Sequence, residues 1–220
     1  MSDRSDAFDA ADSSRSISAP SDRRIARSVH THAILTEAMI ELIIEGNPWP
    51  TARQVADRAD TSVRTVFNHF HIDVLFGHAA ATLISRHRAL VAIVPAKGPV
   101  DARIQATCHQ RRQFFEAIAP LIRVAHIRVG SSPGLNKALQ DLEAFLQRQV
   151  AVTFGREISS DGRDGPLLLE QLDLITGWRT WNALRNHPVR SATAAEQAMV
   201  MFATRLLAHP ISGSPTKASR

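Results

Sequence analysis

The amino-acid sequence predicts an all-helical fold of about nine helices, on three observations. Apolar residues recur every three or four positions along most of the chain, and no long segment alternates between apolar and polar residues as a half-exposed strand does. Short stretches rich in glycine and proline separate the periodic segments. Of the 220 residues, 44% are hydrophobic and 21% are charged, so the chain can bury a core.

The two ends of the chain differ from this periodic region. Residues 1–20 are rich in serine, aspartate and alanine and predict a disordered tail, and residues 211–220 are expected to form a flexible C-terminal tail. No apolar segment resembles a signal peptide, and none is long enough to cross a bilayer. The single cysteine, Cys108, suits a reducing compartment. We therefore expect a cytoplasmic protein without membrane contact.

The first predicted helix begins near Arg23 and ends at Gly46, which two prolines follow. Apolar residues recur along it and form one broad stripe, at Ile34, Leu35, Ala38, Met39, Leu42 and Ile43. Arg23, Arg24 and Arg27 precede this helix or open it. They can contact a phosphate backbone or enter a minor groove as an arm, and a solvated helix start is the alternative interpretation.

Two short helices follow, at residues 51–59 and 62–69. The sequence TARQ predicts a capping box, in which Thr51 is the N-cap and Gln54 reaches back to it. The chain then breaks at residues 59–61, and the next helix directs Val66 and Phe70 inward. Two short helices joined by such a turn, after a longer packing helix, form a helix-turn-helix arrangement. We expect it to form a domain over residues 21–72.

The outer face of helix 62–69 is polar and carries no carboxylate. Arg64, Thr65, Asn68 and His69 lie on this face, and their side chains can donate to phosphates or to base edges in a major groove. The formal net charge of +5 and the sequence pI of about 10.5 favour a polyanionic partner. The spacing alone fits a connector within a helical bundle equally well.

A longer pattern runs through these three helices. It reads Ile34-Leu35-x-x-Ala38-x-x-x-Leu42-Ile43-x-Glu45-Gly46, then Thr51-x-Arg53-x-Val55-Ala56-x-x-Ala59, then Ser62-x-x-Thr65-Val66-Phe67-x-His69-Phe70. Over about residues 25–76 it resembles the N-terminal domain of the tetracycline-repressor (TetR) family; beyond residue 80 the resemblance is architectural. The resemblance implies a homodimeric transcriptional regulator, usually a repressor, whose C-terminal domain binds a small molecule.

The resemblance also makes helix 62–69 the recognition helix for double-stranded DNA. The residues that it places at the DNA are Thr51, Arg53, Ser62, Val63, Arg64, Thr65, Phe67, Asn68 and His69. Asp60 departs from the family pattern because a turn glycine is common there, and Phe67 departs because a tyrosine usually donates to phosphate there. Asp73 lies near the usual position of a phosphate-binding lysine, so that contact is absent or replaced by His71. These departures weaken the expected affinity and not the expected fold.

Six longer helices are predicted beyond residue 72, at 73–93, 100–117, 119–128, 135–154, 166–186 and 192–208, with a polar loop at 155–166. We expect them to form one domain over residues 73–210 with a cavity for a small molecule. Candidate lining residues are His109, Phe114, Phe115, Ile122, His126, Phe145 and Trp178, and plain core positions are the alternative. Few of them are polar, which favours an apolar or weakly polar ligand.

The last two predicted helices indicate a dimer interface. Helix 166–186 carries a wide apolar band, and helix 192–208 repeats small and apolar residues at Ala195, Ala198, Met199, Phe202 and Leu206. The resemblance implies that this pair forms a four-helix bundle with its symmetry mate, and a two-fold dimer binds a pseudo-palindromic operator. The alternative is that both helices belong to the core of one chain.

The sequence carries no catalytic constellation, so we expect neither an enzyme nor a cofactor or metal. Cys108 and His109 are adjacent on a helix, where their side chains diverge by roughly 100°. No HExxH motif and no glycine-rich phosphate loop occur. The prediction is a ligand-responsive, sequence-specific DNA-binding regulator, a repressor released by a small molecule. Two alternatives stay open: an activator or ligand-independent DNA-binding protein, and a helical interaction or carrier protein that has lost DNA binding.

Overall fold

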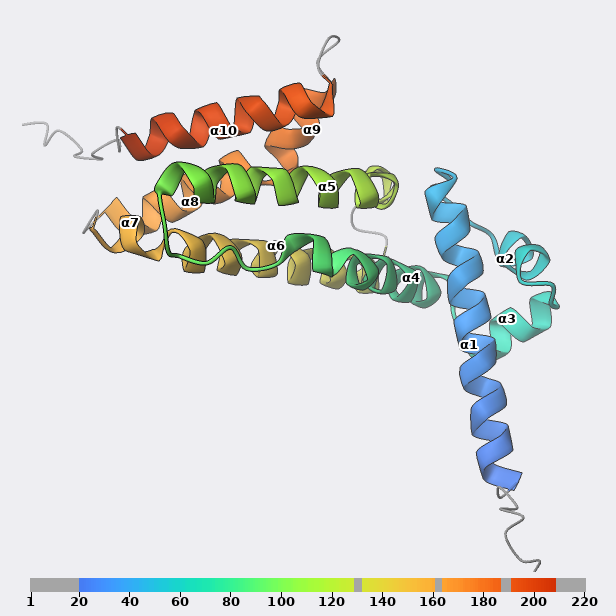
Figure 1. Ribbon diagram of the computed structural model, residues 1–220. Helices are drawn as coiled ribbons and strands as arrows, with labels where there is room; N and C mark the ends of the chain where they lie inside the picture. Colours follow the sequence, from blue (N-terminus) through green and yellow to red (C-terminus); the bar gives the residue numbers. More distant parts are fainter. Residues whose placement is uncertain (1–19, 129–131, 161–163, 187–190, 209–220) are drawn as a thin grey trace, which may run out of the picture.

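The computed structural model describes residues 20–128, 132–160, 164–186 and 191–208. Every regular element in these ranges is a helix, which confirms the predicted all-helical class. The elements are α1 (Pro20–Ile44), α2 (Ala52–Arg58), α3 (Val63–His69), α4 (Ile72–His87), the 3-10 helix η1 (Arg88–Val91), α5 (Val100–Ile127), α6 (Pro133–Thr153), α7 (Gly155–Ser160), α8 (Gly165–Thr176), α9 (Trp178–Asn186) and α10 (Ala192–Ala208) (Figure 1). The predicted tails lie outside the described residues, except that α1 begins at Pro20.

Helix α2 packs against α1 and α3 at one end of the molecule (Figure 1). The predicted stripe of α1 is buried at Leu35, Ala38, Met39, Leu42 and Ile43. Ile34, at the edge of the stripe, is 37% exposed. Gly46 ends the helix with a φ of +84°, a conformation that glycine adopts at low cost, and its N–H donates to the Ile43 carbonyl at 2.9 Å.

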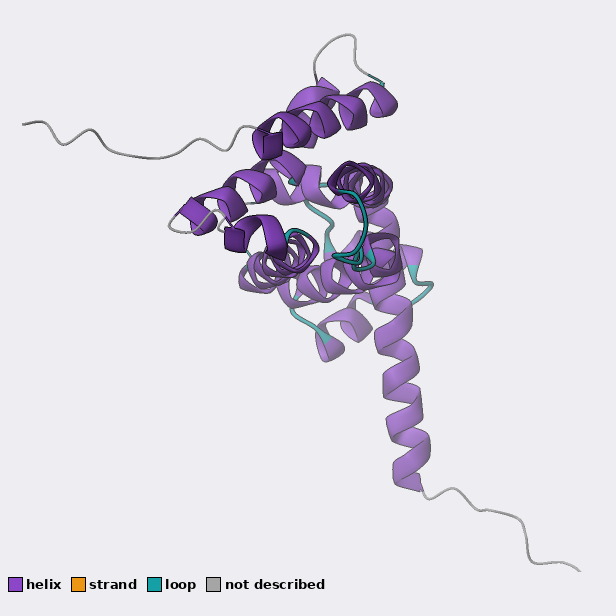
Figure 2. Ribbon diagram, turned by 60° about the vertical axis from the view of Figure 1, so that its left-hand side comes forward, coloured by secondary structure: helices purple, strands orange, loops and turns teal. Residues whose placement is uncertain are grey.

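Helices α4 to α10 pack around α5. Helix α4 leads from α3 into this group and contacts both α1 and α6, while α10 lies along the outer side of α5 (Figure 1). The first turns of α1 extend away from the other helices (Figure 2), and Ile25 and Val29 on these turns are more than half exposed. No described helix is long and apolar enough to span a membrane.

Helix α5 is continuous across Pro120, so the prediction of two helices over 100–117 and 119–128 was wrong. A proline inside a helix removes a backbone hydrogen bond and costs about 3 kcal/mol. On both sides of it α5 buries large side chains, among them Phe115, Ile118, Leu121 and Ile122. Burial of each such side chain contributes roughly 1.5–3 kcal/mol, so tertiary packing outweighs the effect of the proline.

Three further predictions of element boundaries were wrong. The segment 166–186 forms two helices because the chain turns at Gly177, where a Cβ would lie 2.8 Å from the Asp173 carbonyl oxygen. The predicted polar loop 155–166 contains α7, whose Glu157 accepts a hydrogen bond from Arg103 of α5 at 3.0 Å. Likewise, the predicted helix 73–93 ends as α4 at His87 and continues as η1.

Candidate nucleic-acid interface

The turn between α2 and α3 is fixed by hydrogen bonds at both of its ends. The predicted capping box is present, because Gln54 N–H donates to Thr51 Oγ1 at 3.2 Å and Thr51 N–H donates to Gln54 Oε1 at 2.9 Å. Asp60 adopts a φ of +47°, and Thr61 N–H donates to the Ala56 carbonyl at 2.9 Å, as in a Schellman helix end. Asp60 therefore takes the left-handed position that glycine commonly fills.

Helix α3 buries one face and exposes the other. Val66 is fully buried and Phe70 is 8% exposed, as predicted. Arg64, Asn68 and the ring of Phe67 face solvent, and Phe67 is 62% exposed. Of the other predicted residues, Thr51, Arg53 and Ser62 are exposed, and Val63, Thr65 and His69 are half-buried. The nine predicted residues thus belong to α2, α3 or their N-caps, and six of them are exposed.

The arginines near this face divide into two kinds. Arg58 of α2 is held by α1, with Nη1 at 3.0 Å from Glu41 Oε2 and at 2.9 Å from Glu45 Oε1. The hydrogen bond from Arg58 lowers the pKa of Glu45, and those to Glu45 and Glu41 raise the pKa of Arg58. Arg53 and Arg64, in contrast, are exposed and form none of the ion pairs found within the described residues.

His69, at the end of α3, packs against a histidine of α1. The ring centroids of His32 and His69 are 5.0 Å apart in a T-shaped arrangement, and His32 lies 4.4 Å from Phe70. The ring of His78 from α4 lies 5.5 Å from that of Phe70. Burial lowers the pKa of His32, and the charges of His69 and His78 lower it further. This cluster joins α1, α3 and α4.

Asp73 forms an ion pair with Arg128 inside the protein. Arg128, at the end of α5, donates to Asp73 Oδ1 at 2.5 Å and to the Pro48 carbonyl at 3.4 Å. Its guanidinium also lies 4.7 Å from the ring centroid of Trp49 and 4.3 Å from that of Phe76. Arg128 is only 4% exposed, and these contacts connect α5 to α4 and to the loop before α2.

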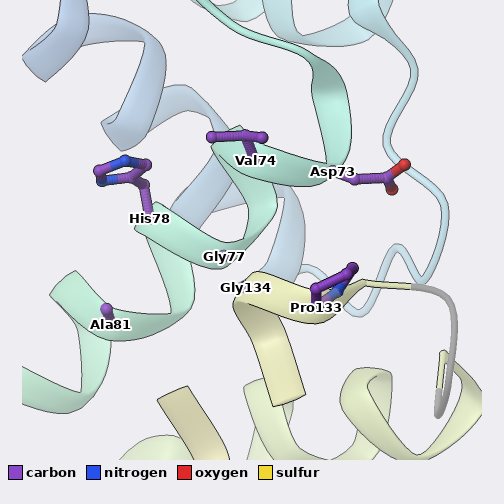
Figure 3. A pocket seen from close by; sticks show the side chains of 7 residues that line it. All are labelled: Asp73, Val74, Gly77, His78, Ala81, Pro133 and Gly134. Carbon is purple, nitrogen blue, oxygen red and sulfur yellow. The ribbon is translucent and has the colours of Figure 1, made fainter. Parts of the chain in front are cut away.

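A groove of about 330 Å³ lies beside this ion pair, between α4 and α6. Figure 3 shows that Gly77 of α4 and Gly134 of α6 meet at its base. A Cβ on Gly77 would lie 2.9 Å from the backbone of Gly134, so these two helices approach too closely for a side chain. Ser132 Oγ donates to the Asp73 carbonyl at 3.1 Å and adds a second connection here.

A larger cavity of about 730 Å³ lies among α5, α6, α8 and the start of α9. Of the predicted ligand-binding residues, Phe115, Ile122, His126 and Trp178 line it. The other predicted residues lie elsewhere. His109 faces Glu196 of α10 at 3.3 Å, Phe114 is fully buried, and Phe145 packs under the Arg88 guanidinium at 3.9 Å.

The carboxylates of this cavity were not predicted from the sequence. Glu143, Glu170 and Asp173 belong to its lining, which is more polar than the aromatic candidates suggested. Acidic residues on helices usually mark a solvated face, so the sequence held no signal that these three line one cavity.

The single cysteine, Cys108, lies outside the cavity. Burial raises the pKa of its thiol to about 12, so it is a poor nucleophile at neutral pH.

The helices predicted to form a dimer contribute to the core and also expose apolar side chains. Ala195, Ala198 and Met199 of α10 are buried within the chain. Met201 and Phe202 of α10 are 41% and 38% exposed, and Leu174 of α8 is 60% exposed.

The three arginines near the start of the described chain lie on α1. Arg23, Arg24 and Arg27 are exposed on its first turns, and so belong to a helix rather than to an extended arm.

Comparisons with protein-family models, with curated proteins and with solved structures gave no match to this chain.

Proposed function

We propose that this protein is a dimeric regulator of transcription that binds specific sequences of double-stranded DNA with α3, in the manner of the TetR family. Helices α1 to α3 would form its DNA-binding domain. Helices α4 to α10 would form a domain for dimerisation and for a small-molecule effector. The expected activity is repression that the effector relieves.

The exposed face of α2 and α3 is the observation that carries this proposal. Arg53 and Arg64 present guanidinium groups that no carboxylate within the described residues neutralises, and guanidinium groups bind phosphate in bidentate fashion. Asn68 is exposed one turn after Arg64, and asparagine can pair with the adenine edge in a major groove. Glu41 and Glu45, which would repel DNA, are paired with Arg58 on the flank toward α1.

Arg128 supports a link between the two proposed sites. It ends α5, whose residues Ala125 and His126 line the 730 Å³ cavity one turn earlier. Its own side chain contacts Asp73 and Trp49, which lie next to α3 and α2. A ligand that shifts the end of α5 can thereby move the recognition helices of the dimer out of register with two half-sites. The coupling is limited by the difference in the ligand's affinity for the two conformers.

The dimer is supported by the exposed apolar side chains of α8 and α10. Leu174 of α8 and Met201 and Phe202 of α10 expose apolar surface, and these two helices lie apart from α2 and α3 (Figure 1). A two-fold axis near these helices would make the interface isologous and leave both copies of α3 available to DNA. Such a dimer binds two half-sites about one helical turn apart.

Selection of bound duplexes from a random-sequence DNA pool tests this function. We expect the wild-type protein to enrich an inverted repeat, because a two-fold dimer imposes its symmetry on the site. The double variant Arg64→Ala/Asn68→Ala should lose the enrichment and keep the wild-type melting temperature, because both side chains are exposed. Arg148→Ala removes an exposed arginine from α6 and should behave as wild type. A pool that stays random with the wild-type protein contradicts the proposal.

A protein-binding module is the second candidate, and the exposed ring of Phe67 favours it. A phenyl ring that is 62% exposed on a recognition helix offers no hydrogen bond to phosphate, whereas aromatic side chains are enriched at protein interfaces. Phe67→Tyr distinguishes the two candidates. If α3 lies on a phosphate backbone, the added hydroxyl should strengthen DNA binding. If the partner is a protein, neither the wild-type protein nor Phe67→Tyr should bind DNA measurably.

A further inference from the structure

The cavity among α5, α6, α8 and α9 carries an excess of negative charge. Glu143 of α6 and Glu170 and Asp173 of α8 face it, whereas Arg179 of α9 supplies the one guanidinium among its described lining residues. Behind the wall, Arg111 of α5 is 2% exposed and donates to the Leu146 carbonyl at 2.8 Å. Three carboxylates against two guanidinium groups leave one net negative charge around the cavity.

Asp173 is the innermost of these carboxylates. It is half-buried, whereas Glu143 and Glu170 are exposed. Burial raises the pKa of Asp173; the positive charge of Arg111 opposes this shift, and the negative charge of Glu143 adds to it. Burial lowers the pKa of Arg111 only to about 10, so Arg111 stays charged at neutral pH. A ligand cation between Asp173 and Glu143 would remove the repulsion between these two carboxylates.

Aromatic side chains form the inner wall beside these charges. Phe115 and Trp178 both line the cavity, with ring centroids 5.7 Å apart in a T-shaped arrangement, and Trp181 supports Trp178 from behind at 5.2 Å. The face of an indole or phenyl ring attracts a cation placed over it. Leu139 and Leu142 of α6 add apolar surface for the remainder of a ligand.

The remaining polar groups do not favour an anion. Arg179 is exposed, and His126 has its Nδ1 2.8 Å from the Ile122 carbonyl, which occupies that nitrogen. An anionic ligand would meet three carboxylates in the lining, against the single guanidinium of Arg179. The volume of about 730 Å³ falls within the range of roughly 300–1,000 Å³ typical of small-molecule sites.

We propose that the effector cavity takes an amphipathic organic cation, an ammonium, amidinium or phosphonium group on an aromatic or aliphatic body. Its charge would lie between Asp173 and Glu143, and its apolar body against Phe115 and Trp178. This inference rests on the proposed function, in which the cavity holds the effector. It differs from the apolar or weakly polar ligand that the sequence suggested, because carboxylates from two helices converge on one site.

Two ions of nearly equal size and shape but opposite charge test the proposal. Titration calorimetry of the full chain, without DNA, compares tetraphenylphosphonium with tetraphenylborate. We expect one tetraphenylphosphonium per chain and binding of tetraphenylborate at least about tenfold weaker, because only the cation finds opposite charges. Asp173→Asn and Glu143→Gln should each weaken cation binding about three- to tenfold. Asp141→Asn, an exposed change on α6 at a residue paired with Lys137, should have no effect.

Three results would overturn the inference: failure of both ions to bind, equal or tighter binding of the anion, or the same affinity in Glu143→Gln as in Asp141→Asn. Glu143 is exposed, so its variant keeps the test valid even if Asp173→Asn fails to fold. The DNA selection is a separate measurement. Cation binding without DNA enrichment rejects only the proposed function, and DNA enrichment without cation preference rejects only this inference.

Discussion

At the scale of single residues, one backbone conformation sets the angle between α2 and α3. Asp60 has a φ of +47° and is the one non-glycine residue with a positive φ among those described. A left-handed conformation costs an L-residue about 1–2 kcal/mol, and aspartate tolerates it better than most residues. The Schellman hydrogen bond from Thr61 to Ala56 depends on this conformation. The departure from glycine is therefore compatible with the turn.

Substitution of Asp60 tests this interpretation. Asp60→Gly should change the free energy of unfolding by no more than about 0.5 kcal/mol, since relief of strain offsets the entropy of glycine. Asp60→Val should lower it by about 1–2 kcal/mol, because a β-branched residue is strongly disfavoured at positive φ. Urea denaturation measures both. If the valine variant were as stable as the glycine variant, the turn would not require a left-handed residue.

The histidine cluster should make stability depend on pH. The lowered pKa of His32 means that the folded state favours its neutral form. Its contribution is therefore fully present above the ordinary pKa of 6.5 and is lost as the pH falls below that value. We expect the fall in melting temperature from about pH 7.5 to about pH 5.5 to be smaller in His32→Gln than in the wild-type protein.

His30→Gln is the matched control for this measurement. His30 is exposed two residues earlier on α1 and takes part in none of the ring contacts found among the described residues. It should keep the pH dependence of the wild-type protein. The same pH dependence in both variants would show that His32 does not couple protonation to folding.

At the scale of elements, the contact between α4 and α6 depends on the absence of a side chain. Gly77→Ala places a methyl group 2.9 Å from the Gly134 backbone, which must move. Overpacking costs about 1–3 kcal/mol, and the gain in helix propensity returns at most about 1 kcal/mol. We expect a net loss of about 1–2 kcal/mol in urea denaturation.

Gly155→Ala on α7 is the control for this substitution. A Cβ there meets no atom within 4 Å, so the change should be neutral or stabilising. Equal stability of the two alanine variants would mean that α4 and α6 can separate without cost.

Local rules predicted the elements whose ends are set by their own residues. The capping box at Thr51, the glycine end of α1 at Gly46 and the inward pair Val66 and Phe70 were all predicted correctly. The continuous helix across Pro120 was not, because its cause is the packing of distant helices against α5. The carboxylates of the cavity were missed for the same reason, since they meet only after α6 and α8 pack together.

At the scale of the whole molecule, the ion pair of Arg128 and Asp73 joins the end of α5 to the start of α4, which follows α3 in the chain. If the proposed function holds, tetraphenylphosphonium should weaken DNA binding of the wild-type protein by about 5- to 150-fold, the usual range of coupling between two sites. Asp73→Asn keeps the shape of the side chain and removes its charge. This variant should bind the cation with wild-type affinity. Its DNA affinity without the cation, divided by its DNA affinity with the cation, should be smaller than in the wild-type protein.

Asp101→Asn, an exposed change at the opposite end of α5, should keep the wild-type ratio. Comparison of ratios removes any direct effect of the lost charge on DNA affinity. A wild-type ratio in Asp73→Asn would place the coupling elsewhere in the molecule.

The salt dependence of DNA affinity tests the central claim, that the exposed arginines of α2 and α3 lie on a phosphate backbone. Fluorescence anisotropy with the selected duplex, over a series of salt concentrations, gives the slope of log affinity against log salt. We expect a steep negative slope for the wild-type protein and a slope smaller in magnitude by about 2 for the Arg64→Ala dimer, which loses one phosphate contact in each protomer. A slope that is flat, or that Arg64→Ala leaves unchanged, would contradict it.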